Sequence, residues 1–509
     1  MVSQRHSGAP VEDQAKIAEE RDQDRGLRRC CCSAECCAIA VFILLLIGTA
    51  LFFLFEGITK DLTNVDLLAR PTPWRIIHQQ TKDHGPGSRR PNIRYGHTIT
   101  SYHGQMIVTH GYFYNAAQNL ATWLSDTWAL DMKSYKWSLL SEGINQSRAL
   151  QAYRQGHPTQ PCGRFGHGIG IFNDTLYMYG GHDGGYSRTG QHNYAPEHDF
   201  DELWAFSFQE KRWTLLAAKP DPALLPIAAN KDGSSSDNAT TPGKRYLLAS
   251  VVIDGVMIVY GGNKDGQGDV WALDLRQEGK VWRRLSPERP RDQGGPGRRV
   301  GAAIFPVNFP GAPRGFVLYG GRNAGKQGNE PVLLGDAWFF DLSTLKWRQL
   351  KMIGPAPSPR RYHGFTHMHI AVQEPGSSAV WRGRHSKASV FVGVIVGGSV
   401  DSPSHVCSGD SWAFTLDCGL ESLTWIRLPD IPYAIYDMHA ASHKQSVFSF
   451  GGHLCRDSRK DLPFSYTNQV WKLDVAPHIF PWLTQSSSCQ FHSDETHLGH
   501  AFDPRGNEL

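Results

Sequence analysis

The sequence lacks several features that would assign it to a common class of protein. Its formal charge is only +4 over 509 residues, so it has no basic excess that would attract a phosphate backbone, and we expect no nucleic-acid partner. It contains no nucleophile elbow, phosphate-binding P-loop or dinucleotide fingerprint. Its one long apolar run lies near the N-terminus. The information is therefore in its tryptophans, glycines and short apolar segments.

Most of the tryptophans follow a repeating pattern. In five rounds an acidic residue stands two positions before a tryptophan, and a second tryptophan follows after a short polar turn. The tryptophans are Trp128 and Trp137, Trp204 and Trp213, Trp271 and Trp282, Trp338 and Trp347, Trp412 and Trp425, with Trp471 in a sixth round. Two glycines precede each round, such as Gly180 and Gly181, except that the first has His110 and Gly111. Glycines suit places where backbones approach closely. Four short strands per interval of roughly 50 residues predict a β-propeller.

With these motifs the chain resembles the kelch repeat family over about residues 74–475. The resemblance implies an all-β fold, a six-bladed kelch-type β-propeller over residues 74–483. A propeller has to join its two ends, because open edge strands invite aggregation. The segment Trp74–Ile77 is similar to a second-tryptophan strand, so we expect it to complete the sixth blade. The alternatives are closure by the C-terminal stretch around Trp482 and a seventh blade built from both.

Residues 38–57 predict one transmembrane helix, because the stretch from Ala38 to Phe55 carries no charge and, with Cys36 and Cys37, reaches the roughly 20 residues that cross a bilayer. Four arginines precede it and mainly acidic residues follow, so the positive-inside rule places residues 1–37 in the cytosol. We expect a type II single-pass membrane protein with a signal-anchor helix. Residues 58–73 would link it to a luminal or extracellular propeller, and residues 484–509 would form a tail. A cleaved signal peptide is the alternative.

The cysteines divide between the two sides of this membrane. Five lie at the cytosolic edge as candidates for S-palmitoylation, unless they are simply tolerated at a helix end: Cys30, Cys31, Cys32, Cys36 and Cys37. On the luminal side Cys407 and Cys418 bracket one predicted strand and are too far apart to bond. We therefore expect disulfides between Cys407 and Cys455 and between Cys418 and Cys489, with Cys162 left over. Three sequons, at Asn145, Asn173 and Asn238, predict glycosylation on that side.

The predicted blades have one face with long connections. Strands run antiparallel, so the connections between strands two and three and between strands four and one emerge together, and these are the long ones. We expect this long-loop face to bind a partner.

Arginines that open the first strands are the candidate ligand contacts on this face: Arg94, Arg164, Arg245, Arg299 and Arg361. Their forked donors suit the carboxylates of an acidic peptide or an anionic glycan, and the kelch resemblance implies a comparable use. The alternative is that each arginine pairs with the acid before the first tryptophan of its round. The sixth round lacks both members, with Pro432 and Tyr433 at its opening and Gln469 before Trp471, which favours pairing.

The function expected is that of a membrane-anchored binding module for a protein or an anionic glycan. We predict no catalytic residue, no cofactor and no metal site, since the candidate ligands between His182 and Asp201 have no spacing that enforces a coordination geometry. Some kelch-type propellers are copper radical oxidases or sugar isomerases, but no such constellation can be read here. The alternatives are a luminal carbohydrate-active enzyme with its site at the channel mouth, and a structural protein that packs against copies of itself.

Overall fold

The computed structural model describes residues 73–79, 89–115, 120–184, 199–216, 241–262, 268–323, 332–372, 388–400, 406–455, 466–483 and 490–492. All of them belong to one compact unit, Thr72–Leu509. The expected cytosolic tail, the expected membrane helix and nearly all of the expected linker lie outside the described residues. Within the described residues, no helix has both the length and the apolar character that a membrane crossing needs.

The described part of the chain is all-β and forms six successive groups of four antiparallel strands, which we call sheets one to six. Sheet one holds β2 (Thr98–Tyr102), β3 (Gln105–Thr109), β6 (Thr127–Asp131) and β7 (Trp137–Ser141). Sheet two holds β8 (Gly168–Phe172), β9 (Thr175–Tyr179), β10 (Leu203–Ser207) and β11 (Arg212–Leu216). Sheet three holds β12 (Ala249–Ile253), β13 (Val256–Tyr260), β14 (Val270–Asp274) and β15 (Trp282–Ser286).

The remaining sheets follow the same order, and the strands are again named from first to fourth. Sheet four holds β16 (Ala303–Val307), β17 (Gly315–Tyr319), β18 (Ala337–Asp341) and β19 (Lys346–Ile353). Sheet five holds β20 (Gly364–Val372), β21 (Ala388–Ser399), β22 (Cys407–Leu416) and β23 (Ser422–Leu428). Sheet six holds β25 (His439–His443), β26 (Ser446–Phe450), β28 (Val470–Asp474) and, as its fourth strand, β1 (Trp74–His78).

The apolar core lies between neighbouring sheets, because successive side chains of a strand point to opposite faces. In β3, Ile107 packs with residues of sheet two, whereas Met106 and Val108 pack with residues of sheet six. Equivalent apolar clusters join sheets two and three, three and four, four and five, and five and six. The second strands are buried on both faces, which explains why their sequences are nearly continuous apolar runs.

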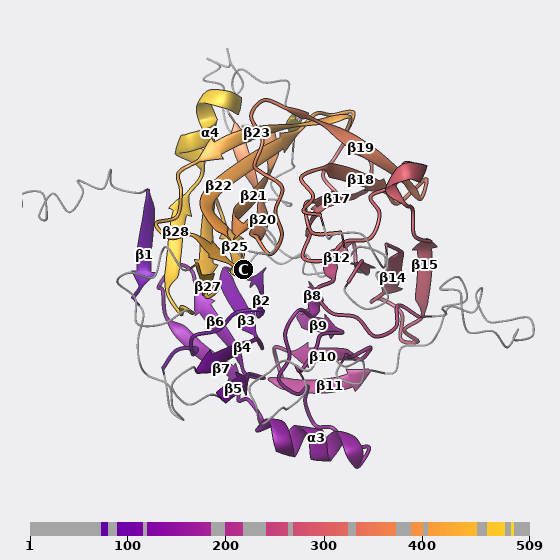
Figure 1. Ribbon diagram of the computed structural model, residues 1–509, viewed down its shortest axis with the longest axis vertical. Coiled ribbons are helices and arrows are strands. Elements are labelled where there is room, and N and C mark those ends of the chain that lie inside the picture. Colours follow the sequence, from indigo (N-terminus) through magenta and orange to yellow (C-terminus); the bar gives the residue numbers. More distant parts are fainter. Residues whose placement is uncertain are drawn as a thin grey trace, which may run out of the picture. The chain divides into compact units, whose positions relative to one another are not determined.

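The six first strands contact one another in a closed cycle, from β2 to β8, β12, β16, β20, β25 and back to β2. Figure 1 shows β2, β8, β12 and β25 near the middle of the view and fourth strands such as β7, β11 and β15 towards its periphery. The tryptophans of the fourth strands add contacts between sheets. Trp282 of sheet three meets Tyr179 of sheet two with ring centroids 4.9 Å apart, and Trp425 of sheet five meets Tyr319 of sheet four at 4.8 Å. These tryptophans therefore act in packing.

The N-terminal segment supplies the fourth strand of the last sheet, as predicted. β1 pairs antiparallel with β28, with Trp74 opposite Leu473 and Ile76 opposite Trp471. Trp74 is only 2% exposed, and its Nε1 donates a 2.9 Å hydrogen bond to the carbonyl of Pro429. The competing C-terminal stretch instead forms the helix α4 (Ala476–Leu483), which packs on the cluster between sheets five and six.

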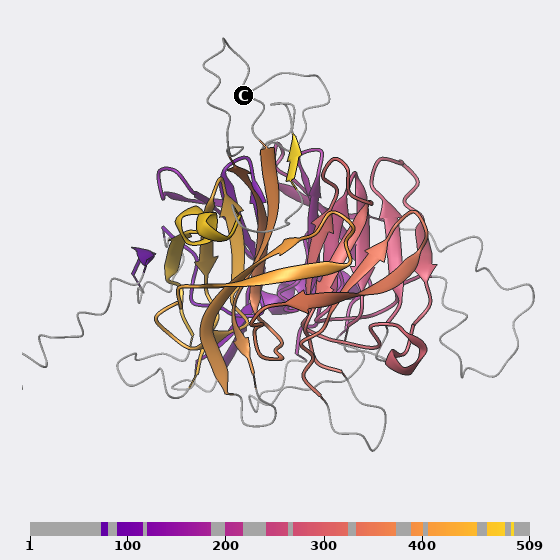
Figure 2. The ribbon, with the colours of Figure 1, turned by 90° about the horizontal axis from the view of Figure 1, so that it is seen from above.

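Sheets four and five are joined at their outer edges. The end of β19 pairs parallel with β23, with Lys351 opposite Ser422, and Figure 2 shows these two strands next to one another. A short strand from the expected C-terminal tail, β29 (Gln490–His492), pairs with the start of β21. The tail is thus part of the folded body at this point, which the sequence did not predict.

One predicted disulfide is present, and of the other the structure describes only one cysteine. Cys407 is bonded to Cys455, with Cα atoms 6.1 Å apart, so this prediction is confirmed. Cys418 is also held in a disulfide, but its predicted partner Cys489 lies outside the described residues. Cys162 is a free, buried cysteine.

Candidate functional site

The arginine before each of the first five first strands forms a buried ion pair with the acid two residues before the tryptophan of the third strand. The arginine side chains are at most 1% exposed. The pairs are Arg94 with Asp126 (2.7 Å), Arg164 with Glu202 (2.9 Å), Arg245 with Asp269 (3.1 Å), Arg299 with Asp336 (3.0 Å) and Arg360 with Asp410 (2.5 Å). The pairing alternative of the sequence analysis is therefore correct.

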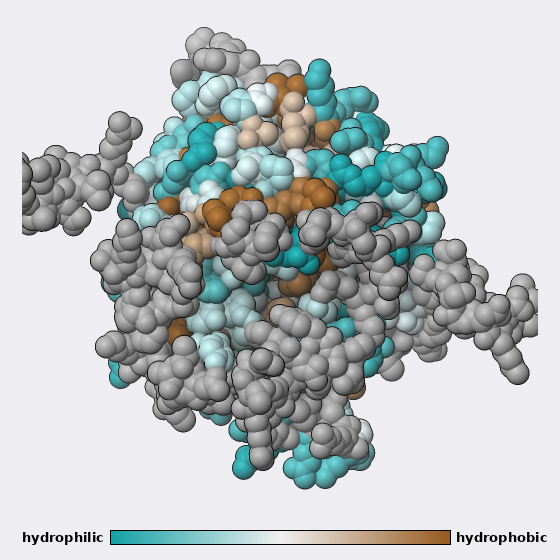
Figure 3. Space-filling view, in the orientation of Figure 1, coloured by the Kyte–Doolittle hydropathy of each residue, from teal (hydrophilic) through white to brown (hydrophobic). Residues whose placement is uncertain are grey.

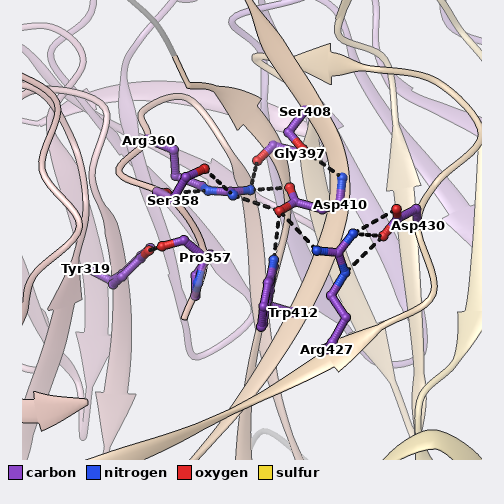
Figure 4. A network of polar contacts seen from close by, with 10 residues as sticks. All are labelled: Tyr319, Pro357, Ser358, Arg360, Gly397, Ser408, Asp410, Trp412, Arg427 and Asp430. Atoms are coloured by element: carbon purple, nitrogen blue, oxygen red, sulfur yellow. Dashed lines mark hydrogen bonds and ion pairs between the residues drawn. The ribbon is translucent and has the colours of Figure 1, made fainter. Parts of the chain in front are cut away.

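Figure 4 shows the pair in sheet five. Arg360 donates from Nη2 to Asp410 Oδ2 at 2.8 Å and from Nη1 to the carbonyl of Gly397 at 2.9 Å. Asp410 also accepts a 2.8 Å hydrogen bond from Trp412 Nε1. Burial alone would raise the pKa of Asp410, but the hydrogen bonds and the charge of Arg360 lower it to about 2. The spacing of acid and tryptophan in the sequence thus reflects one carboxylate that binds both an arginine and an indole.

The candidate ligand contacts are accordingly corrected. Four of the five arginines, Arg94, Arg164, Arg245 and Arg299, are buried in these ion pairs, so they hold the third strand to the first rather than facing a partner. The arginine predicted to open the first strand of sheet five was misplaced by one residue, because Arg360 rather than Arg361 forms the ion pair of that sheet. In sheet six the opening was off by three, since Ile435 and Tyr436 occupy it in the short strand β24 (Ile435–Tyr436).

Arg361 occupies a different position, which is equivalent to Tyr95, Phe165, Tyr246, Val300 and Tyr436 in the other sheets. Its backbone pairs with Ser399, with N–H to O distances of 2.9 and 3.0 Å. The residue is 5% exposed, its guanidinium carbon lies 4.6 Å from the centroid of the Tyr362 ring, and its Nε has no hydrogen-bond partner. Arg361 is thus a nearly buried cation over an aromatic ring.

A second arginine, Arg322, lies close enough to Arg361 for the charge of Arg361 to act on it. It follows the paired glycines of sheet four and forms backbone bridges with Val300 and Leu333. Burial and then the charge of Arg361 lower its pKa, and its Nε also has no partner. Within the described part of the chain, neither arginine forms an ion pair with a carboxylate. Two adjacent cations that form no ion pair with a carboxylate among the described residues are a favourable place for an anion.

A cycle of backbone hydrogen bonds holds this region. The residue two positions after each opening arginine, or after Ile435 in sheet six, has positive φ: Gly96, Gly166, Leu247, Gly301, Tyr362 and Asp437. From sheet two to sheet six, its N–H donates to the carbonyl of the equivalent residue in the preceding sheet, as from Tyr362 to Gly301 (3.0 Å) and from Asp437 to Tyr362 (2.7 Å). The second glycine of a pair likewise donates to the opening arginine of the next sheet, and Gly452 donates to Arg94 (2.9 Å), which joins sheet six to sheet one.

Aromatic rings surround the two arginines. The charges of Tyr362 and Tyr246 act on Arg322, and Tyr436, whose hydroxyl contacts His453 Nδ1, is within electrostatic range of Arg361. His453 packs against Tyr466, with ring centroids 4.7 Å apart. We call Arg322, Arg361, Tyr362, Tyr436 and Asp437 the arginine–tyrosine cluster.

Two exposed valines lie at the bases of the connections between second and third strands in sheets four and five. Val332, 57% exposed, accepts a backbone hydrogen bond from Asn323, and Val406, 49% exposed, accepts one from Val400. Figure 3 shows that the described residues on the visible face are mainly hydrophilic, with apolar residues gathered near the middle of the view. Val332 and Val406 are thus exposed apolar residues in the same two sheets that supply Arg322 and Arg361.

Sequence reasoning found Arg361, although for the wrong position, and missed Arg322 and Asp437. A signal for both was present: Arg322 directly follows a glycine pair, and Asp437 stands where three other rounds have glycine. To use this signal, the six rounds must be aligned residue by residue at the start of each first strand. The sequence alone left that alignment ambiguous.

The other predicted site residues divide between described and undescribed parts. Asn145 and Asn173 are exposed, and Asn173 lies in the tight turn between β8 and β9. Asn238 and the five juxtamembrane cysteines lie outside the described residues. His182 Nδ1 lies 2.6 Å from Asp199 Oδ1. No group of three or more metal-ligating side chains occurs among the residues that the structure covers.

Comparison with known proteins gives a partial likeness. No protein-family model matches the sequence. The acyl-CoA-binding domain-containing protein 4 of Arabidopsis thaliana is 23% identical over 225 residues, which are 43% of this chain and 28% of that protein. The chain thus aligns with less than a third of the length of this relative.

Proposed function

We propose that the protein is a membrane-anchored interaction module, a six-bladed propeller of the kelch type that binds a protein or a glycan through its long-loop face. The group recognised is a carboxylate, bound at Arg361 and Arg322. The anchor is the helix expected at residues 38–57, which would place the propeller on the luminal or extracellular side.

Three observations support the propeller. The first strands contact one another in a closed cycle, an apolar cluster lies between every pair of neighbouring sheets, and the fourth strand of the last sheet comes from the N-terminal segment. Repetition of one four-stranded unit around an axis is the architecture in which these features occur together.

One observation carries the proposed function: among the described residues Arg322 and Arg361 form no ion pair with a carboxylate, whereas five other, buried arginines are each matched to an acid. Arginine's planar fork fits a carboxylate with two hydrogen bonds. Burial strengthens this contact because water competes less for the guanidinium group. An acidic protein segment and an acidic glycan share this chemistry.

The test measures binding of the full-length protein, held in detergent micelles, to two immobilised probes, deca-glutamate and polygalacturonate. We expect Arg361→Gln and Arg322→Gln each to weaken binding about 10-fold or more, because a hydrogen bond to a charged group contributes roughly 1.5–3 kcal/mol. Arg348→Gln is the matched control, since Arg348 is 40% exposed in a surface pair with Glu421.

Selectivity between the two probes identifies the partner class. Stronger binding of deca-glutamate points to a protein, and stronger binding of polygalacturonate points to a glycan. Equal binding by the Arg361→Gln, Arg322→Gln and Arg348→Gln variants would refute the proposed site. Cleavage of the polygalacturonate would instead support the enzyme alternative.

A further inference from the structure

Asp437 is an unusual residue for its position. It lies in the backbone cycle where sheets one, two and four have Gly96, Gly166 and Gly301, and its φ is 55°. Its N–H donates a 2.7 Å hydrogen bond to the carbonyl of Tyr362, the residue after Arg361. Aspartate tolerates positive φ better than most side chains, but glycine would serve the backbone equally well. The carboxyl group is therefore not explained by the local conformation.

The carboxyl group of Asp437 is also poorly compensated. The residue is 9% exposed, and within the described residues its side chain forms no ion pair. The charge of Arg361 acts on it, and the charge of Asp437 adds to burial in raising the pKa of the neighbouring Tyr436. A buried carboxyl group without a partner is expected to be stabilised in its neutral form. Burial indeed raises its pKa to about 7, even though the charge of Arg361 acts in the opposite direction.

We propose that Asp437 is a specificity-determining residue of the carboxylate site: when neutral it donates a hydrogen bond to a carboxylate bound at Arg361, and when ionised it repels that carboxylate. This inference rests on the proposed function. The ligand arrives ionised, Asp437 takes one proton from solvent, and no covalent bond changes. The site then binds its partner at mildly acidic pH and releases it as the pH rises above neutrality.

Other titratable or charged groups lie around Asp437 on each neighbouring element, and their protonation could also change with pH. They are Arg361, Tyr362 and His363 before β20, Arg322 after β17, His97 before β2, Tyr436 and His439 on the segment of Asp437, His453 in β27 (His453–Leu454), and Tyr466. Burial lowers the pKa of His363 to about 3 and that of His439 to about 4, and it lowers the pKa of His97 well below its usual range. These three therefore stay neutral between pH 6 and 8.

The experiment is calorimetric titration of the full-length protein with deca-glutamate at pH 6 and pH 8. The glutamates, with an ordinary pKa of about 4.3, stay ionised at both values. With a pKa of about 7, the neutral fraction of Asp437 falls from about ten elevenths at pH 6 to about one eleventh at pH 8. We therefore expect binding to weaken about 10-fold over this range. At pH 7, buffers of different ionisation enthalpy should report uptake of about half a proton.

Two substitutions at Asp437 separate the roles of charge and hydrogen bond. Asp437→Asn keeps a donor and cannot ionise, so at pH 8 it should bind as tightly as the unaltered protein does at pH 6. Asp437→Gly keeps the backbone conformation found in three other sheets and removes the donor, so its binding should be weaker than that of Asp437→Asn and independent of pH. His453→Gln controls for the neighbouring imidazole and should keep the pH dependence.

The outcomes distinguish this inference from the function on which it rests. Equal affinity at pH 6 and pH 8 in the unaltered protein would overturn the role of Asp437 and leave the carboxylate site intact. A pH dependence that survives Asp437→Asn would also overturn it, and its loss in His453→Gln would assign it to the imidazole. Failure of the unaltered protein to bind at either pH would overturn the proposed function as well.

Discussion

The ion pair between Arg360 and Asp410 can be tested with a replacement that the chain itself supplies. In sheet six the equivalent positions hold Ile435 and Gln469, and Gln469 still accepts a 3.2 Å hydrogen bond from Trp471 Nε1. The double substitution Arg360→Ile with Asp410→Gln therefore copies an uncharged version of the same arrangement. Arg360→Ile leaves Asp410 with only the half-exposed Arg427, 3.7 Å away, and Asp410→Gln leaves the buried Arg360 without a carboxylate.

The expected loss follows from burial and charge. Arg360 is 0% and Asp410 is 11% exposed at the side chain, and removal of one member of such a pair costs about 3–5 kcal/mol. The fall in the pKa of Asp410 from 3.8 to about 2 corresponds to about 2.4 kcal/mol of folding stability. Because this pKa is lowered in the folded state, the stabilisation is present above about pH 4 and is lost as the pH falls towards 2. The second value lies below the first, because the pKa shift reports only how much the folded state favours the ionised form of Asp410.

The assay is thermal unfolding at pH 7, followed by calorimetry. For a folded body of about 400 residues, 3–5 kcal/mol corresponds to about 4–6 °C in Tm. We expect each single variant to lose this much and the double variant to recover most of it, since an uncharged replacement of a buried pair is often neutral. Arg212→Gln, which removes an exposed partner of Glu210, should leave Tm unchanged. A double variant whose loss equals the sum of the two single losses would refute the reasoning.

Three further predictions concern stability. Trp74→Ala should lower the free energy of unfolding by about 3–5 kcal/mol, because it removes a buried ring from the closing strand; Trp482→Ala, at a residue 52% exposed, is the control, and equal losses would argue against the closure. Cys407→Ser with Cys455→Ser should cost about 4 kcal/mol, the chain-entropy value for a separation of 48 residues; an unchanged denaturation midpoint would contradict this. Burial lowers the pKa of His363 and His367 to about 3 and that of His369 and His439 to about 4. These lowered values keep the four imidazoles neutral in the folded state, whereas the unfolded chain protonates them below about pH 6.5. Between pH 6.5 and 4 the free energy of unfolding should therefore fall by up to about 1.4 kcal/mol per pH unit for each histidine. Denaturation curves at pH 7 and pH 5 check this, and equal free energies would count against it.

The repeat was predictable because its local signals agree with each other. The acid before each tryptophan, the paired glycines and the doubly apolar strands all arise from one unit used six times. The N-terminal strand was identified because Trp74–Ile77 carries the same pattern as the fourth strands. The bond between Cys407 and Cys455 followed from counting strand directions.

The positions of the arginines show where such counting stops. Arg360 and Arg361 are adjacent, so their sequence fits either as the opening residue, and only the hydrogen bonds to Asp410 and Gly397 decide between them. A shift of one residue moves a side chain to the opposite face of a strand. The same shift moves Arg361 out of the ion-pair position, and among the described residues it forms no ion pair with a carboxylate.

The sequence by itself determined the unit that repeats, the residues that build its core and the strand that closes it, because these depend on local propensity and on side-chain periodicity. Tertiary structure alone decided that four of the candidate arginines are buried in ion pairs. It also decided that Arg322, Arg361 and Asp437 lie together, that β19 pairs with β23, and that β29 extends sheet five. Such contacts join residues far apart in the chain, so no local pattern records them.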